Sequence, residues 1–396
     1  MVGLLVNSLA RGGAEKIVLY IAKGLAENNQ DVTIICLVRQ NDYPIPEGLK
    51  INYLSNLYKY EKGFKPSKIL LFPVMVFRLR KLIRGKNIHI VQSHLFSASI
   101  FNVIAGLLGC KHSIQIVNHS QINYEKINKY TGYIKIAILR FIYQRADLLI
   151  SISRQMMDYI NDHILNKSDV NHIVIYNPHD IRGITGKMDE TVKELKFLKG
   201  KKYIITAGRL IKSKRIDMLI CAFSDIRNYY PEYELIILGD GAEYNSLVKL
   251  SGDLKIKDKV HFVGFVDNPY KFISRSDIFV MASESEGLPN AIIEAMACGT
   301  PVISTDCRTG PRELLAPETD YNKILKDTME VADFGILVPV GDVALLTEAI
   351  KHVIENYSTF KNKAGLAIDF VQKFSVENSM VKYLECFSLK HSNHAG

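Results

Sequence analysis

The sequence predicts an α/β protein of two doubly wound domains, each with a parallel sheet covered by helices on both faces. The chain has 396 residues, enough for two domains that each bury a core. Short apolar runs alternate with helical stretches through its first half, a pattern typical of parallel sheets. The alternation begins again after a polar segment at residues 180–201, which favours two such domains in succession.

The first domain is expected to span residues 1–178. Its first strand is the apolar run VGLLVNSL, which begins at Val2, and a helix is expected from Ala14 to Asn28. Asn177-Pro178 ends the alternation. Further strands are expected at Asp31–Val38, Ile88–Ser93, Ser113–Asn118, Asp147–Ser153 and His172–Tyr176.

The second domain is expected to span residues 190–374, with residues 180–201 as a linker leading into it. A helix is expected from Arg215 to Tyr229, and the chain closes with a helix at residues 375–390. Strands are expected at Lys202–Ala207, Tyr233–Leu238, Val260–Val263, Ile278–Ala282, Val302–Thr305 and Ile336–Val338.

Cysteine usage and hydropathy predict a cytoplasmic protein that is soluble or lies on a membrane surface. The six cysteines form no C-x-x-C pair, and most lie in apolar runs, which favours reduced core residues over disulfides or zinc ligands. No signal peptide is visible, and the longest apolar run, Ile69–Phe77, is roughly half as long as a membrane span.

The formal net charge is +9, and much of the excess lies in two basic segments of the first half, at residues 59–86 and 126–145. Both segments also carry apolar residues, a combination that suits contact with anionic inner-membrane lipid. Ordinary amphipathic helices packed on a sheet would show the same pattern, and the two readings stay open. Nucleic acid is disfavoured as a partner because no binding motif accompanies the charge.

The segment from Ala282 to Gly299, ASESEGLPNAIIEAMACG, predicts a site for a sugar nucleotide. Gly287 and Leu288 precede Pro289, which suits the first turn of a helix. The backbone N–H groups from Asn290 to Ile292 would then point outward as a site for a diphosphate. Glu286 before the helix would hold sugar hydroxyls. Glu294, one turn behind Asn290, would hold ribose hydroxyls.

A second cluster of charge follows the first strand of the second domain. Arg209 and Lys214 both lie close enough to that strand to reach the diphosphate of a leaving nucleotide. An arginine fork and a lysine charge would stabilise the negative charge that develops as the sugar departs. Solvated loop cations are the alternative. The sequence has no D-x-D pair, so no metal and no other cofactor is expected.

The first domain offers three further candidates after its strands. Gly12 and Gly13 follow the first strand and open a helix, where paired glycines allow close approach to a phosphate or a sugar, although a plain turn would also use them. His119 ends a strand and is expected to face a ligand cleft as a hydrogen-bond donor. His94 ends the preceding strand and is a second candidate, with a structural role as the alternative for both.

These motifs together resemble family 4 of the retaining glycosyltransferases, which have the GT-B fold of two Rossmann-like domains facing each other across a cleft. The resemblance rests on the E-x7-E segment, the G-G-A-E at Gly12, and the spacing of Arg209 and Lys214. The family usually has glycine after that lysine, where this chain has Arg215. In the GT-B fold the last helix crosses back to the first domain.

The resemblance implies further roles for residues of both domains. A histidine at the position of His119 lies beside the donor sugar in the family. Gly239, in Gly239-Asp240-Gly241, matches a glycine pair of the donor site, where a simple turn is the alternative. Val263 and Phe265 would line the nucleotide base, unless Phe265 is only a core residue.

A narrower resemblance lies at Asp306–Glu313, DCRTGPRE, and in the insertion from Ala316 to Asp333. Both resemble a subset of the family that builds lipopolysaccharide core, O-antigen, capsule and lipid-linked oligosaccharides in bacteria. The resemblance implies a retaining, metal-independent enzyme with a nucleotide-sugar donor, most readily a UDP-sugar. Its acceptor would be a growing glycan or one linked to a polyprenyl diphosphate.

Two alternatives from other classes remain. A sugar-nucleotide 2-epimerase shares the two-domain fold and a similar nucleotide site, but it needs no acceptor surface. A two-lobed sugar-binding protein would also show twin α/β domains, but an export signal is expected for it. A dinucleotide dehydrogenase is disfavoured because no G-x-G-x-x-G opens either domain.

Overall fold

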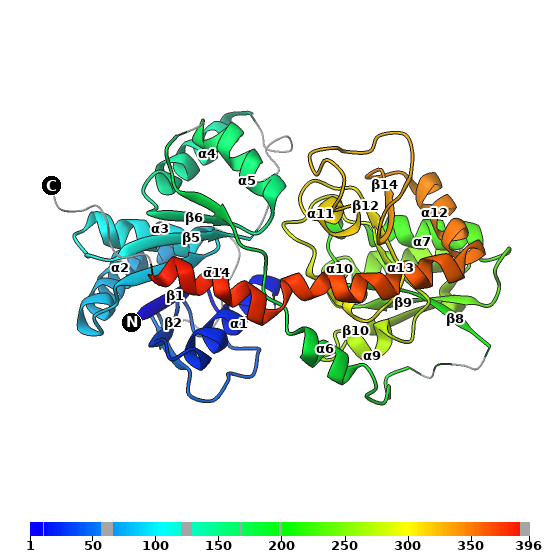
Figure 1. Ribbon diagram of the computed structural model, residues 1–396, viewed down its shortest axis with the longest axis horizontal. Helices are drawn as coiled ribbons and strands as arrows, with labels where there is room; N and C mark the ends of the chain where they lie inside the picture. Colours follow the sequence, from blue (N-terminus) through cyan, green and yellow to red (C-terminus); the bar gives the residue numbers. More distant parts are fainter. Residues whose placement is uncertain are drawn as a thin grey trace. The chain divides into compact units, whose positions relative to one another are not determined.

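The structure is a computed structural model that describes residues 1–10, 12–56, 66–119, 129–166, 168–195, 197 and 200–388. It divides into two compact units (Figure 1). Unit 1 comprises residues 1–179 and 374–396, and unit 2 comprises residues 180–373. Among the described residues, no helix is long and apolar enough to cross a membrane.

Unit 1 contains a seven-stranded parallel sheet in the order β3-β2-β1-β4-β5-β6-β7. The strand β3 was not predicted, because its four residues are only partly buried and show no apolar run. The strands are β1 (Val2–Val6), β2 (Val32–Cys36), β3 (Lys50–Tyr53), β4 (Ile90–His94), β5 (Ser113–Asn118), β6 (Leu148–Ser151) and β7 (His172–Val174).

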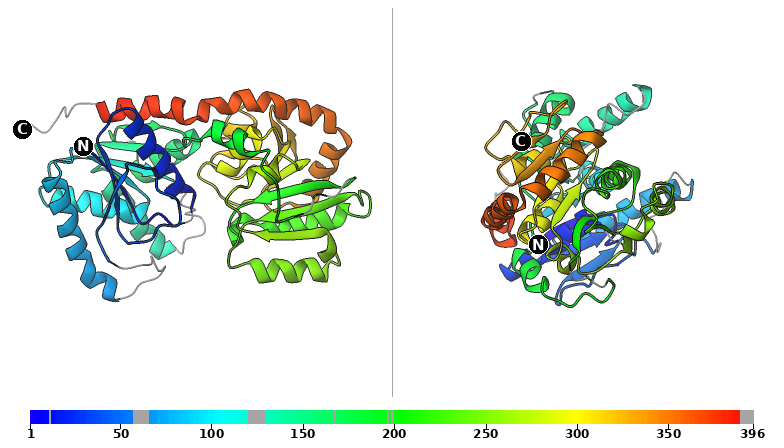
Figure 2. Two further views of the ribbon diagram at one scale, coloured as in Figure 1. Left: turned by 90° about the horizontal axis from the view of Figure 1, so that it is seen from below. Right: turned by 90° about the vertical axis from the view of Figure 1, so that its right-hand side faces the viewer.

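The last helix of the chain belongs to unit 1 and packs against its first helix (Figure 2). A side chain at Gly24 would lie 2.6 Å from Met380 Cγ, so glycine allows this close packing. The helices of unit 1 are α1 (Gly13–Glu27), α2 (Pro66–Gly85), α3 (Phe96–Leu107), α4 (Lys129–Tyr143), α5 (Arg154–Ile160), the π-helix η2 (Asn161–Leu165) and α14 (Val376–Ser388).

Unit 2 contains a second seven-stranded sheet, in the order β10-β9-β8-β11-β12-β14-β13. All its pairs are parallel except the pairing of the short strand β13 with β14. The strands are β8 (Lys202–Ala207), β9 (Tyr233–Leu238), β10 (Val260–Gly264), β11 (Ile278–Met281), β12 (Val302–Thr305), β13 (Glu330–Val331) and β14 (Gly335–Val338).

The helices of unit 2 begin within the segment that was predicted to be a linker. That prediction is wrong for Ile181–Lys187, which form α6, because the Asp180 carboxylate caps the helix by accepting the Gly183 N–H at 2.8 Å. The other helices are η3 (Lys212–Lys214), α7 (Ile216–Ile226), α8 (Tyr244–Asp253), η4 (Lys257–Lys259), α9 (Tyr270–Ile273), α10 (Asn290–Ala297), α11 (Pro311–Leu315), α12 (Val343–Glu355), α13 (Tyr357–Phe370) and η5 (Val371–Phe374), whose last residue is assigned to unit 1.

The strand orders define where each unit presents its loops. In unit 2 the order reverses at β8, between β9 and β11, and in unit 1 it reverses at β1, between β2 and β4. Ligands of doubly wound sheets bind outside the carboxyl ends of the strands at such points. A ligand site is therefore expected at the loops after β8 and β11 in unit 2 and after β1 and β4 in unit 1.

Candidate functional site

The structure brings together two predicted site residues that lie 72 positions apart in the chain. Lys214 follows β8 and Glu286 follows β11, and these strands are neighbours in the sheet. The Lys214 ammonium donates to Glu286 Oε1 at 2.5 Å, and the side chains are only 25% and 11% exposed. The Glu284 N–H also donates to the Ser213 carbonyl at 2.8 Å, which fixes the two loops to each other.

Arg215 keeps the loop in a conformation that glycine would adopt more easily. Its backbone is left-handed, with φ 46° and ψ 42°, and it lies directly before α7. Its guanidinium contacts the Asp217 carboxylate at 3.1 Å and Glu284 at 3.3 Å. The departure from the family's usual glycine is thus accompanied by two ion pairs that hold the same turn.

The loop that carries Arg209 packs directly against the Gly239–Gly241 turn. A side chain at Gly239, where φ is 127°, would lie 1.9 Å from the Gly208 carbonyl oxygen. The Leu210 N–H donates to the Asp240 carbonyl at 2.9 Å. Glycine at 239 is therefore required for backbone packing in the structure, and the arrangement leaves the Arg209 side chain exposed at the carboxyl edge of the sheet.

The start of α10 differs in one respect from its prediction. Pro289 is the residue before the helix, and the Ile292 N–H donates to the Pro289 carbonyl at 3.0 Å. The prediction of a free, outward-pointing N–H is therefore wrong for Ile292. The first turn of the helix is tight, and the Ile292 N–H is used in its own hydrogen bond. Gly287 and Leu288 are buried, so Leu288 would reach a ligand only through its backbone.

Glu294 is held by a residue that the sequence did not single out. The Tyr270 hydroxyl donates to Glu294 Oε1 at 3.1 Å, and Tyr270 itself is buried on α9. Near the end of β10, Val263 is half-buried and Phe265 is 45% exposed, so Phe265 is not a core residue. The structure therefore offers an exposed aromatic ring where the nucleotide base was expected.

In unit 1 the two histidine candidates form a pair. His94 Nδ1 and His119 Nε2 lie 2.8 Å apart, so one ring donates to the other, and the rings are stacked. Burial lowers the pKa of His119 to about 4, and burial together with His119 holds the pKa of His94 well below its ordinary value. His94 is fully buried, so it can orient His119 but does not face a ligand.

His119 lies at a small cavity beyond the carboxyl ends of β4 and β5. The cavity holds about 140 Å³, and its wall includes Asn118, Lys135 and Tyr143. Because His119 Nε2 is engaged with His94, Nδ1 is the ring nitrogen left for a ligand. The neutral pair would present either a donor or an acceptor there, depending on the tautomer.

The glycine pair of unit 1 has a partner that sequence reasoning missed. Gly12 has an extended backbone, and Gly13 begins α1. The Tyr43 hydroxyl accepts the Gly12 N–H at 3.2 Å and lies 3.0 Å from the Gly12 carbonyl. Gly12 is therefore fixed by Tyr43, and the start of α1 remains the part of this loop suited to a ligand.

No group of three His, Cys, Asp or Glu side chains that could hold a metal ion occurs in the described part of the chain. The charged candidates of unit 2 are instead two cations, Arg209 and Lys214, and two carboxylates, Glu286 beside Lys214 and Glu294 on α10. Such a set suits an anionic ligand that also carries hydroxyl groups.

The two doubly wound sheets, with these charged loops at their carboxyl edges, define a GT-B type of protein. The family model "Glycosyltransferase Family 4" matches residues 11–182, and "Glycosyl transferases group 1" matches residues 187–365. An uncharacterised glycosyltransferase of Methanocaldococcus jannaschii is 32% identical over 70% of both chains. The chain therefore belongs to the family 4 glycosyltransferases.

A further relative and two solved structures are similar over nearly the whole chain. A Campylobacter jejuni protein, the N-acetylgalactosamine-N,N'-diacetylbacillosaminyl-diphospho-undecaprenol 4-alpha-N-acetylgalactosaminyltransferase, is 27% identical over 96% of this chain and 98% of its own. Anabaena HepE in complex with UDP superposes with a TM-score of 0.75 at 19% identity, covering 98% of this chain and 99% of its own. Sucrose-phosphate synthase of Thermosynechococcus elongatus gives a TM-score of 0.77 at 17% identity, with 98% of each chain covered. The GT-B fold predicted from the sequence is confirmed.

Proposed function

We propose that this chain is a retaining, metal-independent glycosyltransferase that moves a sugar from a UDP-sugar to a growing bacterial surface glycan or lipid-linked glycan. The observation that carries the proposal is the Lys214–Glu286 pair. It places a cation suited to a diphosphate beside a carboxylate suited to sugar hydroxyls, at the point where the strand order of unit 2 reverses. The Campylobacter relative, whose name specifies an undecaprenol-linked acceptor, and the UDP complex of HepE support the choice of acceptor and donor.

Each group of the site has one task in this proposal. Glu286 accepts hydrogen bonds from sugar hydroxyls, while Lys214 and Arg209 stabilise the diphosphate. Glu294, oriented by Tyr270, accepts hydrogen bonds from the ribose hydroxyls. The remaining donor contacts are the backbone of Gly287, Leu288 and Asn290, the Gly239 turn, the base contacts Val263 and Phe265, and Gly12 and Gly13 of unit 1.

The chemical step in this proposal occurs on one face of the sugar. The bond between the anomeric carbon and the diphosphate oxygen breaks, and the acceptor hydroxyl oxygen forms the new bond on the same face. The acceptor proton passes to an oxygen of the departing diphosphate, so no protein carboxylate becomes a covalent nucleophile. His119 holds the sugar through Nδ1, and the two cations stabilise the negative charge that develops.

A panel of UDP-sugars, assayed with a bacterial lipid extract, tests the proposal. The expected result is a new glycolipid that keeps the anomeric configuration of the donor, as read by NMR, with equal rates in the presence of EDTA. Failure to bind any nucleotide sugar would contradict the whole proposal. Inversion at the anomeric carbon would contradict only the retaining mechanism, and loss of activity in EDTA would contradict only the metal independence. Conversion of a UDP-sugar to its 2-epimer without an acceptor would identify an epimerase instead.

We also propose that the outer face of α4 contacts anionic lipid. Four large apolar residues of this face are 41–72% exposed, and they recur at helical spacing: Tyr133, Ile134, Ile138 and Phe141. The helix contains no acidic residue, and Arg145 lies over the Phe141 ring at 3.5 Å. An apolar stripe on a purely basic helix complements a negatively charged membrane surface.

Co-sedimentation with vesicles tests this surface. Wild type is expected to bind vesicles that contain anionic lipid, with weaker binding as salt rises. The double variant Ile134→Ser, Ile138→Ser is expected to lose most of this binding, since it removes apolar area from the α4 face. The matched control is Leu366→Ser, which removes an apolar side chain of α13 that is 65% exposed. Equal binding by all three proteins would exclude the α4 face.

A further inference from the structure

The loop that carries Glu286 is fixed from one side by the segment that follows β12. The Thr309 hydroxyl donates to the backbone carbonyl of Glu286. A side chain at Gly310 would lie 2.4 Å from Pro289 Cδ and 3.1 Å from Leu288 Cα, so this backbone lies directly on residues 287–289. The position of Glu286 therefore depends on the shape of the loop at residues 306–312, here called the 306–312 loop.

The 306–312 loop has a conformation that needs outside support. Thr309 is completely buried with φ 67°, and Gly310 has φ 100°. A left-handed backbone is unfavourable for a residue with a side chain, and for a β-branched residue such as threonine it is uncommon. Such a conformation persists only where the surroundings hold it in place.

The support comes from a buried arginine at the end of this loop. Arg312 is 2% exposed, and its guanidinium donates to Asp306 Oδ2 at 2.7 Å, which joins the two ends of the loop. The same guanidinium contacts Glu330 Oε1 at 3.0 Å and Thr319 Oγ1 at 3.1 Å. The loop is thereby closed by one ion pair and attached by the same side chain to the insertion at residues 316–333.

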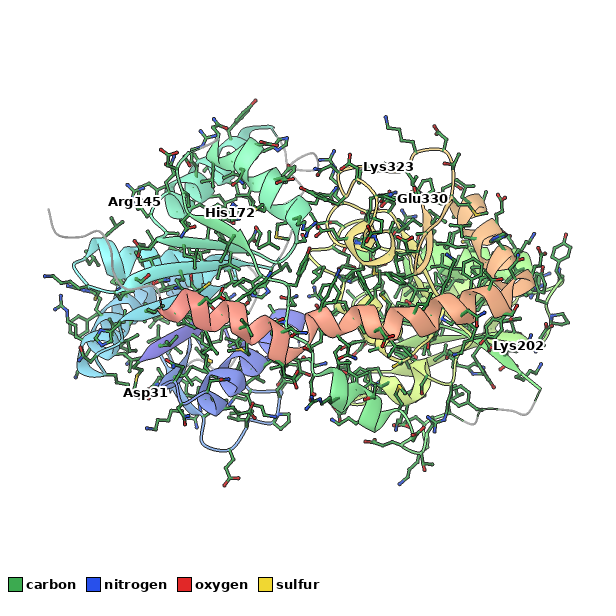
Figure 3. All side chains as sticks on the ribbon, viewed as in Figure 1. Asp31, Arg145, His172, Lys202, Lys323 and Glu330 are labelled. Carbon is green, nitrogen blue, oxygen red and sulfur yellow. The ribbon has the colours of Figure 1, made fainter. Side chains whose placement is uncertain are left out.

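The insertion adds two further contacts to this network. The Leu325 N–H donates to Asp306 Oδ2 at 2.8 Å. Lys323 contacts Glu330 at 2.9 Å, and both side chains are labelled in Figure 3. Burial alone would raise the pKa of Glu330, but hydrogen bonds from Arg312 and Lys323 hold that pKa below its ordinary value. Glu330 is thus a carboxylate partner of Arg312 at neutral pH.

We propose that the insertion at residues 316–333 positions Glu286 for the donor sugar, acting through Glu330, Arg312 and Thr309. Glu286 touches the sugar, whereas these three are positioning residues. The inference rests on the proposed sugar contact of Glu286 and adds a function for the insertion. If the insertion moves, the ion pairs change, the 306–312 loop relaxes, and the carbonyl of Glu286 loses its donor. The cost then appears in sugar binding and turnover, and not in the affinity for UDP.

Hydrogen exchange on the full chain tests this connection without any substrate. Glu330→Ala is expected to speed exchange of the amides at residues 284–292 by about tenfold, while the central strand β9 keeps its rate. The matched control is Glu318→Ala, which removes an exposed carboxylate of the same insertion and is expected to change nothing at residues 284–292. Faster exchange confined to residues 316–333 in Glu330→Ala would overturn the proposal.

A second pair of variants acts at the other end of the connection. Thr309→Val removes the hydroxyl and keeps the shape, and Thr309→Ser restores the donor. Thr309→Val is expected to keep the UDP affinity within about twofold and to lose most of the extra affinity that the sugar adds, with recovery in Thr309→Ser. Recovery is the readout that a merely structural role would not give. Equal loss of UDP and UDP-sugar affinity would overturn the proposal. Absence of any UDP-sugar binding by wild type would defeat the proposed function, and hydrogen exchange would still decide the inference.

Discussion

At the scale of single residues, the candidate site combines pairs of oppositely charged groups with backbone conformations that only local contacts can hold. Arg215 is the clearest case, since its left-handed backbone costs roughly 1–2 kcal/mol for a residue with a side chain. Its ion pairs with Asp217 and Glu284 are partly exposed, and each is worth less than about 1 kcal/mol. The two contributions nearly cancel, so the choice of arginine here is close to neutral for stability.

Two substitutions of Arg215 separate these contributions. Arg215→Ala loses the ion pairs and keeps the backbone cost, whereas Arg215→Gly loses both. Arg215→Gly is therefore expected to be more stable than Arg215→Ala by about 1 kcal/mol, as measured by urea denaturation. Equal stability of the two variants would show that the left-handed backbone at this position carries no cost.

The Lys214–Glu286 pair leads to a prediction about activity. Lys214→Met removes the charge and keeps much of the length, which leaves the Glu286 carboxylate, 11% exposed, without its closest cation. Turnover is expected to fall by about 10²-fold or more, since an electrostatic contact to the leaving group is lost. The matched control is Lys212→Met, which changes an exposed lysine of the same turn and is expected to stay within about twofold of wild type. A similar loss in both variants would point to a general effect of positive charge.

At the scale of elements, the sequence predicted the strands that carry an apolar run, including β7 and β10 at sheet edges, and missed two edge strands that do not. The predicted bounds of β5, β8, β9 and β12 agree with the structure, because each is an apolar run between turn residues. The edge strand β3 and the two-residue β13 lack that signal. Helix α6 was missed because two glycines in IRGITGK lower its helix propensity.

The site shows the same division. Glu286, Lys214 and His119 were singled out because local sequence marks them: Glu286 by the E-x7-E segment, and the other two by their positions after predicted strands. Tyr270 and Thr309 were missed because their importance comes from contacts with Glu294 and Glu286, distant in sequence. A single sequence does not show such contacts, whereas glycine- or proline-marked turns are local and visible in it.

The edge of unit 1 leads to a prediction about acid stability. His172 on β7 lies between Ser151 on β6, at 2.9 Å, and Asn161 of the π-helix η2, at 2.7 Å (Figure 3 labels His172). Burial lowers the pKa of His172 to about 4, although nearby Asp158 acts in the opposite direction. Between about pH 4 and 6.5 the unfolded chain binds a proton here that the folded chain does not. Stability is therefore expected to fall as pH decreases through this window.

Urea denaturation at pH 7 and pH 5 measures this effect. The wild-type free energy of unfolding is expected to fall by on the order of 1 kcal/mol per pH unit from His172, with further contributions from His94 and His119. His172→Gln is expected to be less stable at pH 7 but to lose less on acidification, so the two proteins converge. The control is His163→Gln, which changes an exposed histidine of the π-helix η2. It is expected to keep the wild-type dependence of the unfolding free energy on pH. Parallel pH profiles for wild type and His172→Gln would contradict the prediction.

At the scale of the whole molecule, the chain forms two units that each have a sheet and a core of their own, and the proposed nucleotide contacts divide between them unequally. Arg209, Lys214, Glu286 and Glu294 all belong to unit 2, whereas His119 belongs to unit 1. Unit 1 also includes the last helix, α14, which packs on α1. The proposal thus makes unit 2 the principal holder of UDP.

Hydrogen exchange of the full chain with and without UDP tests whether unit 2 holds most of the nucleotide. A ligand that binds only the folded state stabilises it by about 2.7 kcal/mol when present at 100 times its Kd, and UDP should confer that protection on unit 2 first. The largest slowing is expected in the loops at residues 208–214 and 239–243 and at the start of α10. Glu294→Gln keeps the size of the side chain and removes the charge that would hold the ribose, so it should lower the UDP affinity and the protection together. A ribose contact through Glu294 requires both slower exchange in unit 2 and a lower UDP affinity in Glu294→Gln. Protection confined to unit 1, or equal UDP affinity in Glu294→Gln and wild type, would therefore place the nucleotide elsewhere.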